Sequence, residues 1–345
     1  MPRVITTGPK VQRVLARPRG GDRRRYDAAV DPVPVALDTD IGGDIDDALA
    51  LAFCALHPGV DLRCVTTVNG DTDRRARLAR ALLDLLGRRD VPVGAGASVG
   101  LSGVDNASMP AGLNHGADLI DATGLGAAEP ASALLADVLE RTTRPVEVCA
   151  IGALTNVAAT MAARPDLLDR VAGLHVMGGC LGPVLLGGPD DQEGDPFWEH
   201  NLGCDPIAAA VVWALPLPLR LVPIDVTMPL VLTDDDRVDI AGAGPHGRVL
   251  DALTEEYLAS ARAAAAQGAK RAAVRLHDPL TVVGLVAPEV EVAQVRHLAV
   301  VGSPGRVATF ESTHGRPVTV CRRADAALLR GALVVTLRGG PSHAA

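Results

Sequence analysis

Residues 33–57 read V-P-V-A-L-D-T-D-I-G-G-D-I-D-D-A-L-A-L-A-F-C-A-L-H, and this stretch decides the fold. Val33–Leu37 is a short apolar run rich in β-branched residues, which predicts a buried strand. From Ile45 the apolar residues recur at helical spacing, and they predict a helix that ends at Pro58-Gly59. A strand-to-helix junction of this kind lies at the carboxyl edge of a sheet, where open α/β folds bind their ligands.

Five carboxylates stand between the predicted strand and helix, around a glycine pair: Asp38, Asp40, Asp44, Asp46 and Asp47. These like charges repel one another and are flanked by apolar segments, so they do not form an ordinary solvated surface. Ca²⁺ and Mg²⁺ prefer oxygen ligands, and such a cation is the natural counter-charge. Helix capping and the helix dipole explain one or two of the acids but not five. We therefore predict a metal site, with capping and solvation as the alternative.

Composition narrows the function classes. The 345-residue chain is 48% hydrophobic, which suits one large α/β domain or two small ones. Aromatic residues make up only 2% and the net charge is −8, so both base stacking and polyanion binding are disfavoured and we predict no nucleic-acid partner. Without an apolar run of about 18 residues free of proline and charge, the sequence predicts no membrane span.

The cysteines and the composition of the two end segments predict a cytoplasmic domain flanked by loose ends. The six cysteines are scattered singly without C-x-x-C spacing, which predicts free thiols in a reducing cytoplasm. Residues 1–31 are rich in Arg, Gly and Pro and lack an apolar signal region, so we expect a flexible basic tail, or alternatively a partner-binding arm. We predict one domain over residues 32–338 and a frayed end over 339–345.

The rest of the chain alternates between strand and helix patterns. Further strands are predicted at 61–68, 91–93, 146–151, 174–177, 219–222, 297–301, 306–311 and 317–321. Helices are predicted at 74–86, at 131–140 and within 248–273. Two more helices are predicted to end at Met161 and at Leu329. This alternation predicts an α/β fold with a mainly parallel sheet and right-handed crossovers. The Gly-rich segment 94–126 is predicted to be a functional or mobile loop.

Six motifs occur in a fixed order: D-T-D-I-G-G-D-I-D-D-A at 38–48, T-T-V-N-G-D at 66–71, I-G-A-L-T-N at 151–156, H-V-M-G-G at 175–179, E-H-N-L-G-C-D-P at 199–206 and L-H-D-P-L at 276–280. The ordered set resembles the nucleoside hydrolase family, the inosine–uridine-preferring ribonucleoside N-ribohydrolases, over about residues 33–335. The resemblance implies a single-domain Rossmann-like open sheet, mainly parallel and flanked by helices. It also implies hydrolysis of ribonucleosides to ribose and free base, in nucleoside salvage or catabolism, by a homodimer or homotetramer.

The resemblance assigns a calcium site to one set of residues. Asp40 and Asp47, the backbone carbonyl of Ile151, and Asp278 would be the ligands. Asp40 would also be the general base acting on a calcium-bound water, and Asp38 would support the ligands from behind.

The substrate residues follow from the same motifs. Asp46 would accept hydrogen bonds from the ribose hydroxyls, Met177 would line the ribose pocket, and Glu199 and Asn201 match the sugar-binding E-x-N pair. Carboxylates that face the sugar would stabilise the positive charge that develops on it during N-glycosidic cleavage.

Two histidines match positions beside the leaving base. His277 corresponds to the histidine proposed to protonate that base, and His115 to a loop histidine near it. Protonation of a leaving group by a positioned histidine typically accelerates a reaction by about 10²–10⁴-fold.

The sequence departs from the family pattern in three places. The acidic loop is two residues longer than the shortest pattern, which leaves Asp44 unassigned. Asp71 stands where many members have asparagine, and we predict that it contacts ribose or the metal shell. In segment 181–198 Glu193 is the nearest candidate for a further sugar ligand.

Structural explanations compete with several of these assignments. His277 and Met177 could be core residues, Asn156 could cap a helix, and Asp205-Pro206 could begin one. Two other functions also remain open. A Mg²⁺-dependent haloacid-dehalogenase-like phosphatase shares the D-x-D start, but the chain has a single lysine, Lys270, beyond Lys10. A non-catalytic nucleoside or ribose sensor could have kept the pocket.

Overall fold

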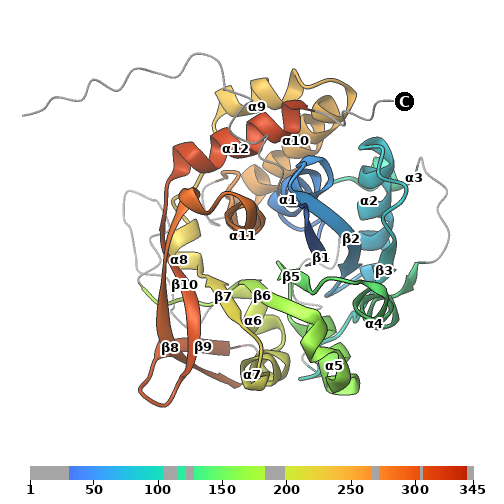
Figure 1. The fold of residues 1–345 in the computed structure, drawn as a ribbon. Helices are drawn as coiled ribbons and strands as arrows, with labels where there is room; N and C mark the ends of the chain where they lie inside the picture. The colour runs from blue at the N-terminus through green and yellow to red at the C-terminus, as the bar shows by residue number, and fades with distance from the viewer. Residues whose placement is uncertain are drawn as a thin grey trace, which may run out of the picture. The chain divides into compact units, whose positions relative to one another are not determined.

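The predicted strand at Val33 lies in the middle of a large sheet. The computed structural model describes residues 31–103, 115–121, 128–182, 199–265, 272–303 and 306–339. Its strands are β1 (Val33–Thr39), β2 (Val60–Thr67), β3 (Val93–Ala95), β4 (Glu129–Pro130), β5 (Val146–Ala150), β6 (Val171–Met177), β7 (Leu219–Val222), β8 (Glu291–Ser303), β9 (Arg306–Glu311) and β10 (Arg316–Ala324). Within the described residues they form one ten-stranded sheet (Figure 1).

The helices alternate with these strands along the chain. They are α1 (Asp46–Leu56), α2 (Thr72–Leu85), α3 (Ala117–Asp121), α4 (Ala131–Arg141), α5 (Thr155–Ala163), α6 (His200–Cys204), α7 (Pro206–Ala214), α8 (Ile224–Thr227), α9 (Asp234–Ala241), α10 (Pro245–Ala265), α11 (His277–Val286) and α12 (Ala326–Gly339). None of the described helices is long and apolar enough to cross a membrane.

The strand order is β4-β3-β2-β1-β5-β6-β7-β10-β8-β9. Every neighbouring pair from β4 to β10 is parallel, and only the β10–β8 and β8–β9 pairs are antiparallel. This arrangement confirms the predicted Rossmann-like, mainly parallel sheet. The chain runs outward from β1 to β4 on one side and from β5 to β7 on the other, so the order reverses between β1 and β5. Such a switch point is where open α/β sheets place a ligand, beyond the carboxyl ends of the strands.

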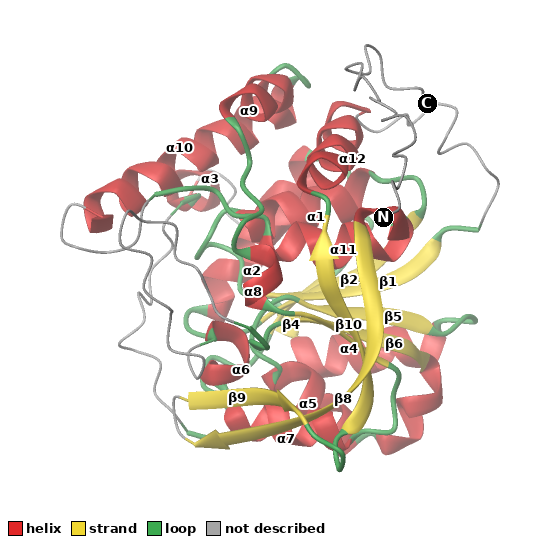
Figure 2. Ribbon diagram, turned by 90° about the vertical axis from the view of Figure 1, so that its left-hand side faces the viewer, coloured by secondary structure: helices red, strands yellow, loops and turns green. Residues whose placement is uncertain are grey.

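Apolar layers cover both faces of the sheet. On one face α1, α2, α11 and α12 pack over alternate residues of β1 such as Val35 and Leu37 (Figure 1). On the other face α4, α5 and α7 cover Ala36 and the facing residues of β5 to β7. The turned view in Figure 2 shows the sheet between these two helical layers. Because the period of a strand is two, one strand supplies both cores.

Helix α1 is buried more completely than its pattern indicates. An apolar stripe from Ile45 predicts one buried face, but every residue of α1 except Leu56 is buried. The reason is that α2, α11 and α12 cover the sides of α1 that the sheet does not. A helix enclosed in this way holds its first residues, Asp46 and Asp47, inside the protein.

The observed ends of a strand differ most from the predicted ends where the strand pairs with a segment distant in the sequence. Strand β8 is predicted at 297–301 but spans Glu291–Ser303, because it pairs along its length with β10 and β9. His57 is the C-cap of α1, so this helix ends just before Pro58-Gly59, as predicted. The predicted basic tail lies outside the described residues except for Asp31, and the predicted frayed end lies outside them except for Gly339.

A substitution at Gly96, which follows β3, tests how closely atoms pack at the carboxyl edge of the sheet. A Cβ there would overlap the Asn156 amide and the Thr67 carbonyl oxygen. We expect Gly96→Ala to lower the free energy of unfolding by about 1–3 kcal/mol, measured by urea denaturation. The control is Gly331→Ala at an exposed position of α12, where no atom lies within 4 Å of the new methyl. That change should be neutral or raise stability by up to about 1 kcal/mol. Equal effects of the two substitutions would contradict this account.

Candidate functional site

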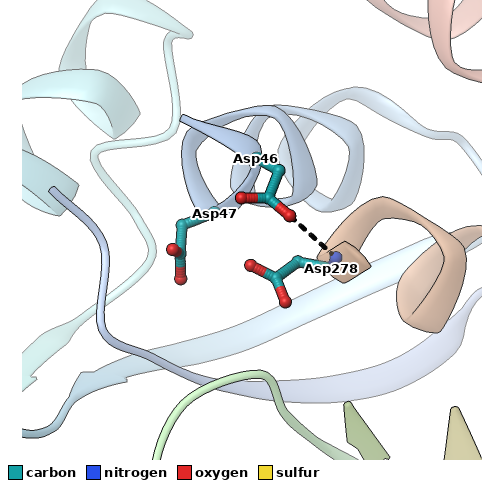
Figure 3. Close-up of side chains that lie close together, drawn as sticks. All are labelled: Asp46, Asp47 and Asp278. Atoms are coloured by element: carbon teal, nitrogen blue, oxygen red, sulfur yellow. Dashed lines mark hydrogen bonds between the residues drawn. The ribbon is translucent and has the colours of Figure 1, made fainter. Parts of the chain in front are cut away.

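Three buried carboxylates converge from distant parts of the sequence. Oxygen atoms of Asp46, Asp47 and Asp278 lie within 4.8 Å of one another. Figure 3 shows that the first two begin α1 and that Asp278 lies at the start of α11. Among the residues that the structure describes, these three form the group that could hold a metal ion.

The first turns of α1 and α11 are joined by Asp46. Its Oδ2 atom accepts hydrogen bonds from the backbone N–H groups of His277, at 3.0 Å, and Asp278, at 3.1 Å. Asp46 therefore opens one helix and satisfies free N–H groups of the other. The positive ends of both helix dipoles consequently point toward the carboxylates, which favours negative charge there.

The electrostatics of this group call for a cation. Burial raises the pKa of Asp46 to about 8, and the charge of Asp44 adds to the shift. Burial also raises the pKa of Asp47 and Asp278 well above the ordinary range, and the neighbouring aspartates add to it. Three such carboxylates ionise together only with a counter-charge. An all-oxygen donor set of this kind fits a hard divalent cation such as Ca²⁺ or Mg²⁺.

Asp47 and Asp38 are fixed by hydroxyl groups of the sheet. The Thr39 hydroxyl donates to Asp47 and also accepts the Ile41 N–H, at 3.1 Å. Asp38 accepts from the Thr66 hydroxyl, at 2.6 Å, and its other oxygen, Oδ2, is buried. Burial raises the pKa of Asp38 to about 7. Asp38 is thus held at the carboxyl end of β1, and its role in supporting the metal ligands stays a prediction.

Asn156 does not cap a helix, although helix capping was the structural explanation considered for it. Helix α5 has no side-chain cap. Instead the Asn156 amide donates to Asp38, at 2.8 Å, and to the Thr67 carbonyl, at 2.9 Å, and accepts the Ala97 N–H, at 3.0 Å. The cap interpretation is therefore wrong, and Asn156 joins the ends of β1, β2 and β3.

Asp40 is close to the acidic group, but its carboxylate is directed elsewhere. Its charge contributes to the raised pKa of Asp47 and Asp278. Its Oδ2 atom lies 3.4 Å from Nε2 of His200. Burial alone would raise the pKa of Asp40, but the contact with His200 and the charge of Arg75 outweigh burial and lower it. Asp40 is therefore ionised where the surrounding aspartates resist ionisation.

Arg75 anchors the acidic loop, and the sequence analysis missed it. Its buried guanidinium group donates to the carbonyl oxygens of Asp40, of Ile41, at 2.8 Å, and of Asn69, at 2.7 Å. Asn69 itself has a left-handed backbone, with φ of 67°. The signal that could have found Arg75 is its helical spacing to Leu78 and Leu82, which puts it on the inward face of α2.

The predicted sugar-binding pair meets two other predicted residues. The Asn201 amide donates to the carbonyl oxygens of Ile151, at 2.9 Å, and Met177, at 3.0 Å. Glu199 caps α6 by accepting the N–H groups of Asn201 and Leu202, both at 2.9 Å. Burial raises the pKa of Glu199. These contacts lie at the ends of β5 and β6, beside the switch point.

The two predicted histidines have different contacts and different burial. Nδ1 of His277 is 2.6 Å from the Thr227 hydroxyl, and the half-buried ring adjoins Asp278. His115 is buried near the Gly43 backbone, and burial lowers its pKa to about 4. The next residue, Gly116, donates its N–H to Glu256 of α10, at 2.7 Å. His115 is therefore neutral at pH 7 in this arrangement.

The remaining candidates lie outside the acidic group. Asp71 is exposed and caps α2 through the Arg74 N–H, at 3.1 Å, so its contact with ribose or the metal shell stays a prediction. Glu193 falls outside the described residues, and its role also stays a prediction. Asp44 is exposed and hydrogen-bonds with Tyr257 of α10. Asp205 caps α7, as expected for a helix start, and also accepts the Thr155 hydroxyl, at 2.7 Å.

Comparisons with known proteins agree with this geometry. Residues 35–343 match the family described as inosine-uridine preferring nucleoside hydrolase. The non-specific ribonucleoside hydrolase RihC of Escherichia coli strain S88 is 32% identical over 265 residues, which cover 74% of this chain and 80% of RihC. RihC of Escherichia fergusonii is 31% identical over 262 residues, with the same coverage.

Solved structures show the same fold. The plant nucleoside hydrolase PpNRh1 superposes with a TM-score of 0.71 at 25% identity and covers 89% of this chain and 99% of its own. The purine-preferring ribonucleoside hydrolase from Gardnerella vaginalis superposes with a TM-score of 0.74 at 23% identity and covers 89% and 98%.

The acidic group should make stability depend on pH and on metal. The pKa of Asp46 is about 8 in the folded protein and near 3.8 as a free group, so the folded state holds the extra proton between these values. Metal-free protein should therefore lose up to about 1.4 kcal/mol of stability per pH unit through Asp46 as the pH rises from 4 to 8, and the raised pKa values of Asp47 and Asp278 act in the same direction. Calcium should stabilise the protein more strongly at pH 8 than at pH 5, because binding requires deprotonated carboxylates. Urea unfolding with calcium or a chelator measures both effects, and a calcium effect independent of pH would contradict them.

Arg75 provides a second test. Arg75→Met removes the donor for three carbonyl oxygens, and we expect a loss of about 2–4 kcal/mol in the free energy of unfolding. Arg77→Met, on the exposed face of the same helix, should change it by less than about 0.5 kcal/mol. Thermal unfolding of both variants decides the matter, and a small loss in Arg75→Met would show that the loop does not depend on this anchor.

Proposed function

The chain belongs to the inosine–uridine preferring nucleoside hydrolase family, and from this premise we propose that it hydrolyses the N-glycosidic bond of ribonucleosides to ribose and free base. Its relatives are named as hydrolases of ribonucleosides. The observation that carries the proposal is the convergence of Asp46, Asp47 and Asp278 at the carboxyl edge, beside the switch point. A buried all-oxygen group there can serve a cation and a polyhydroxylated sugar together.

The metal in this proposal is calcium. The family is metal-dependent, and the buried carboxylates fit a divalent cation. Asp47 and Asp278 would hold the ion from the acidic group, and Asp40 and the Ile151 carbonyl would complete its protein ligands. When bound, the ion would orient water and the ribose hydroxyls and make that water easier to deprotonate.

The protein groups would then divide the reaction between them. Asp40 would take the proton from the attacking water, which agrees with a pKa lowered below the ordinary range. Asp46, Glu199 and Asn201 would hold the ribose hydroxyls, and Met177 would pack against the sugar. The carboxylates facing the ring would stabilise the positive charge that the sugar develops as the bond breaks.

A histidine would assist departure of the base. His277 is the stronger candidate, since the Thr227 hydroxyl orients its ring and the ring is half-buried rather than enclosed. Burial lowers the pKa of His115 to about 4 and keeps its ring neutral. His115 would therefore protonate the base only if its ring became less buried. Protonation by either ring lets the base leave without a full negative charge.

The cellular setting belongs to the same proposal. Six free cysteines, all buried, agree with a reducing cytoplasm, as the sequence predicts. A homodimer or homotetramer, and a role in nucleoside salvage or catabolism, also remain predictions from the family resemblance.

Asp40→Asn tests the proposed base. We expect it to lower kcat at least about 100-fold on whichever of inosine, uridine, adenosine and cytidine the wild type cleaves, because the attacking water loses its proton acceptor. A reducing-sugar assay measures ribose release with calcium and with a chelator. Asp61→Asn, in an exposed ion pair with Arg63, should retain the wild-type rate.

Two outcomes would contradict the proposal. A near-normal rate in Asp40→Asn would remove Asp40 as the base. If the wild type binds nucleosides but releases no ribose from any of the four, the protein is a sensor, and release only from phosphate esters would indicate a phosphatase.

A further inference from the structure

His200 is the side chain that faces Asp40. Its Nε2 atom lies 3.4 Å from Oδ2 of Asp40, a distance that permits an ion pair. It stands between Glu199 and Asn201 in the sequence, but none of the roles assigned above uses it. The His200 side chain is 35% exposed and that of Asp40 is 11% exposed, so the pair lies at the boundary between the buried acids and solvent.

The His200 ring is held in this position from both ends of a short helix. Glu199 caps α6 at its start, immediately before His200. Cys204, at the end of α6, places its sulfur 3.7 Å from Nε2 and 3.9 Å from Nδ1 of the ring. The Asn69 amide in turn donates to that sulfur, at 3.6 Å, and the Asn69 carbonyl accepts from Arg75. The contacts of His200 and of the Asp40 loop therefore form one connected set.

We propose that His200 is a positioning residue for Asp40: its imidazole pairs with the carboxylate and fixes the orientation in which Asp40 takes the proton from water. This inference rests on the proposed function, in which Asp40 is the base. It assigns a role to His200, the central residue of the E-H-N motif, whose neighbours Glu199 and Asn201 are the proposed sugar ligands.

The surrounding charges support this role. Asp40 interacts with the charges of three acidic neighbours, and without a cationic partner their charges and its own burial would favour its neutral form: Asp38, Asp47 and Asp278. The cationic groups that act on it are His200 and Arg75. Arg75 donates to the Asp40 backbone carbonyl, whereas His200 faces the carboxylate itself. Of these two groups, His200 is therefore the one placed to orient the oxygen atoms that would accept the proton.

Two substitutions separate positioning from simple packing. His200→Phe keeps an aromatic ring but removes the N–H, and His200→Gln keeps a donor at the place of Nε2. We expect His200→Phe to lower kcat about 10- to 100-fold, with KM for the nucleoside within about threefold of wild type. His200→Gln should restore kcat to within about fivefold of wild type. Equal losses in the two variants would overturn the proposal.

A measurement without metal or substrate tests the pair directly. His200→Phe should lower the Tm of the chelator-treated protein by a few degrees, and this loss should disappear when Asp40 is already Asn. An equal loss in both backgrounds would show that the ring only packs and would overturn the proposal.

His175→Gln is the matched control. His175 pairs with Glu147, at 2.8 Å, on β6 and β5, and neither residue belongs to the site. This substitution should leave kcat unchanged.

The comparison of His200→Phe with Asp40→Asn separates the proposed role of His200 from the proposed function. If wild type is active, Asp40→Asn is inactive and His200→Phe behaves as wild type, the proposed function stands and the role of His200 falls. If wild type releases no ribose, the proposed function itself falls.

Discussion

The structure depends on one costly arrangement, which is the burial of several carboxylates at a single edge of a sheet. Three features offset the cost. The first turns of α1 and α11 direct their dipoles and free N–H groups at the acids, and Asp46 satisfies N–H groups of the opposite helix. Hydroxyls from Thr39 and Thr66 bond the carboxylates at the ends of β1 and β2. The remaining charge is what a divalent cation would neutralise. The metal ligands implied by the family resemblance and the group found in the structure share Asp47 and Asp278, but the structure groups them with Asp46 whereas the resemblance adds Asp40.

The same residue type takes different roles because its surroundings differ. Asp38 is enclosed between Thr66 and Asn156, and burial raises its pKa to about 7. Asp46 serves as a cap for a second helix. Asp40 alone among the site aspartates faces a cationic ring, His200, and its pKa is lowered. Pairs of acids whose environments separate their pKa values are typical of catalytic sites, and the proposal that Asp40 is the proton acceptor rests on this divergence.

Much of the fold could be predicted from the sequence, and the limits have physical causes. Hydrophobic period and turn residues depend on local geometry, so β1, β7 and β9 were predicted within two residues of their ends. The extra length of β8 comes from pairing with β10, a strand that follows it in sequence, and no local pattern encodes that pairing. Similarly, the motifs predicted which segments meet at the site. The contacts of Arg75, Asn156 and His200 were missed because each depends on the placement of a residue tens of positions away.

The connected contacts explain why the family signature extends over the whole chain. The Asn201 amide binds the Ile151 and Met177 carbonyls and so joins α6 to the ends of β5 and β6. Asn156 joins β1, β2 and β3, and Arg75 joins α2 to the acidic loop. The segments that carry these motifs are therefore joined by hydrogen bonds around the switch point. A loss in any segment would displace oxygen atoms contributed by the others, and a metal site tolerates little displacement of its ligands.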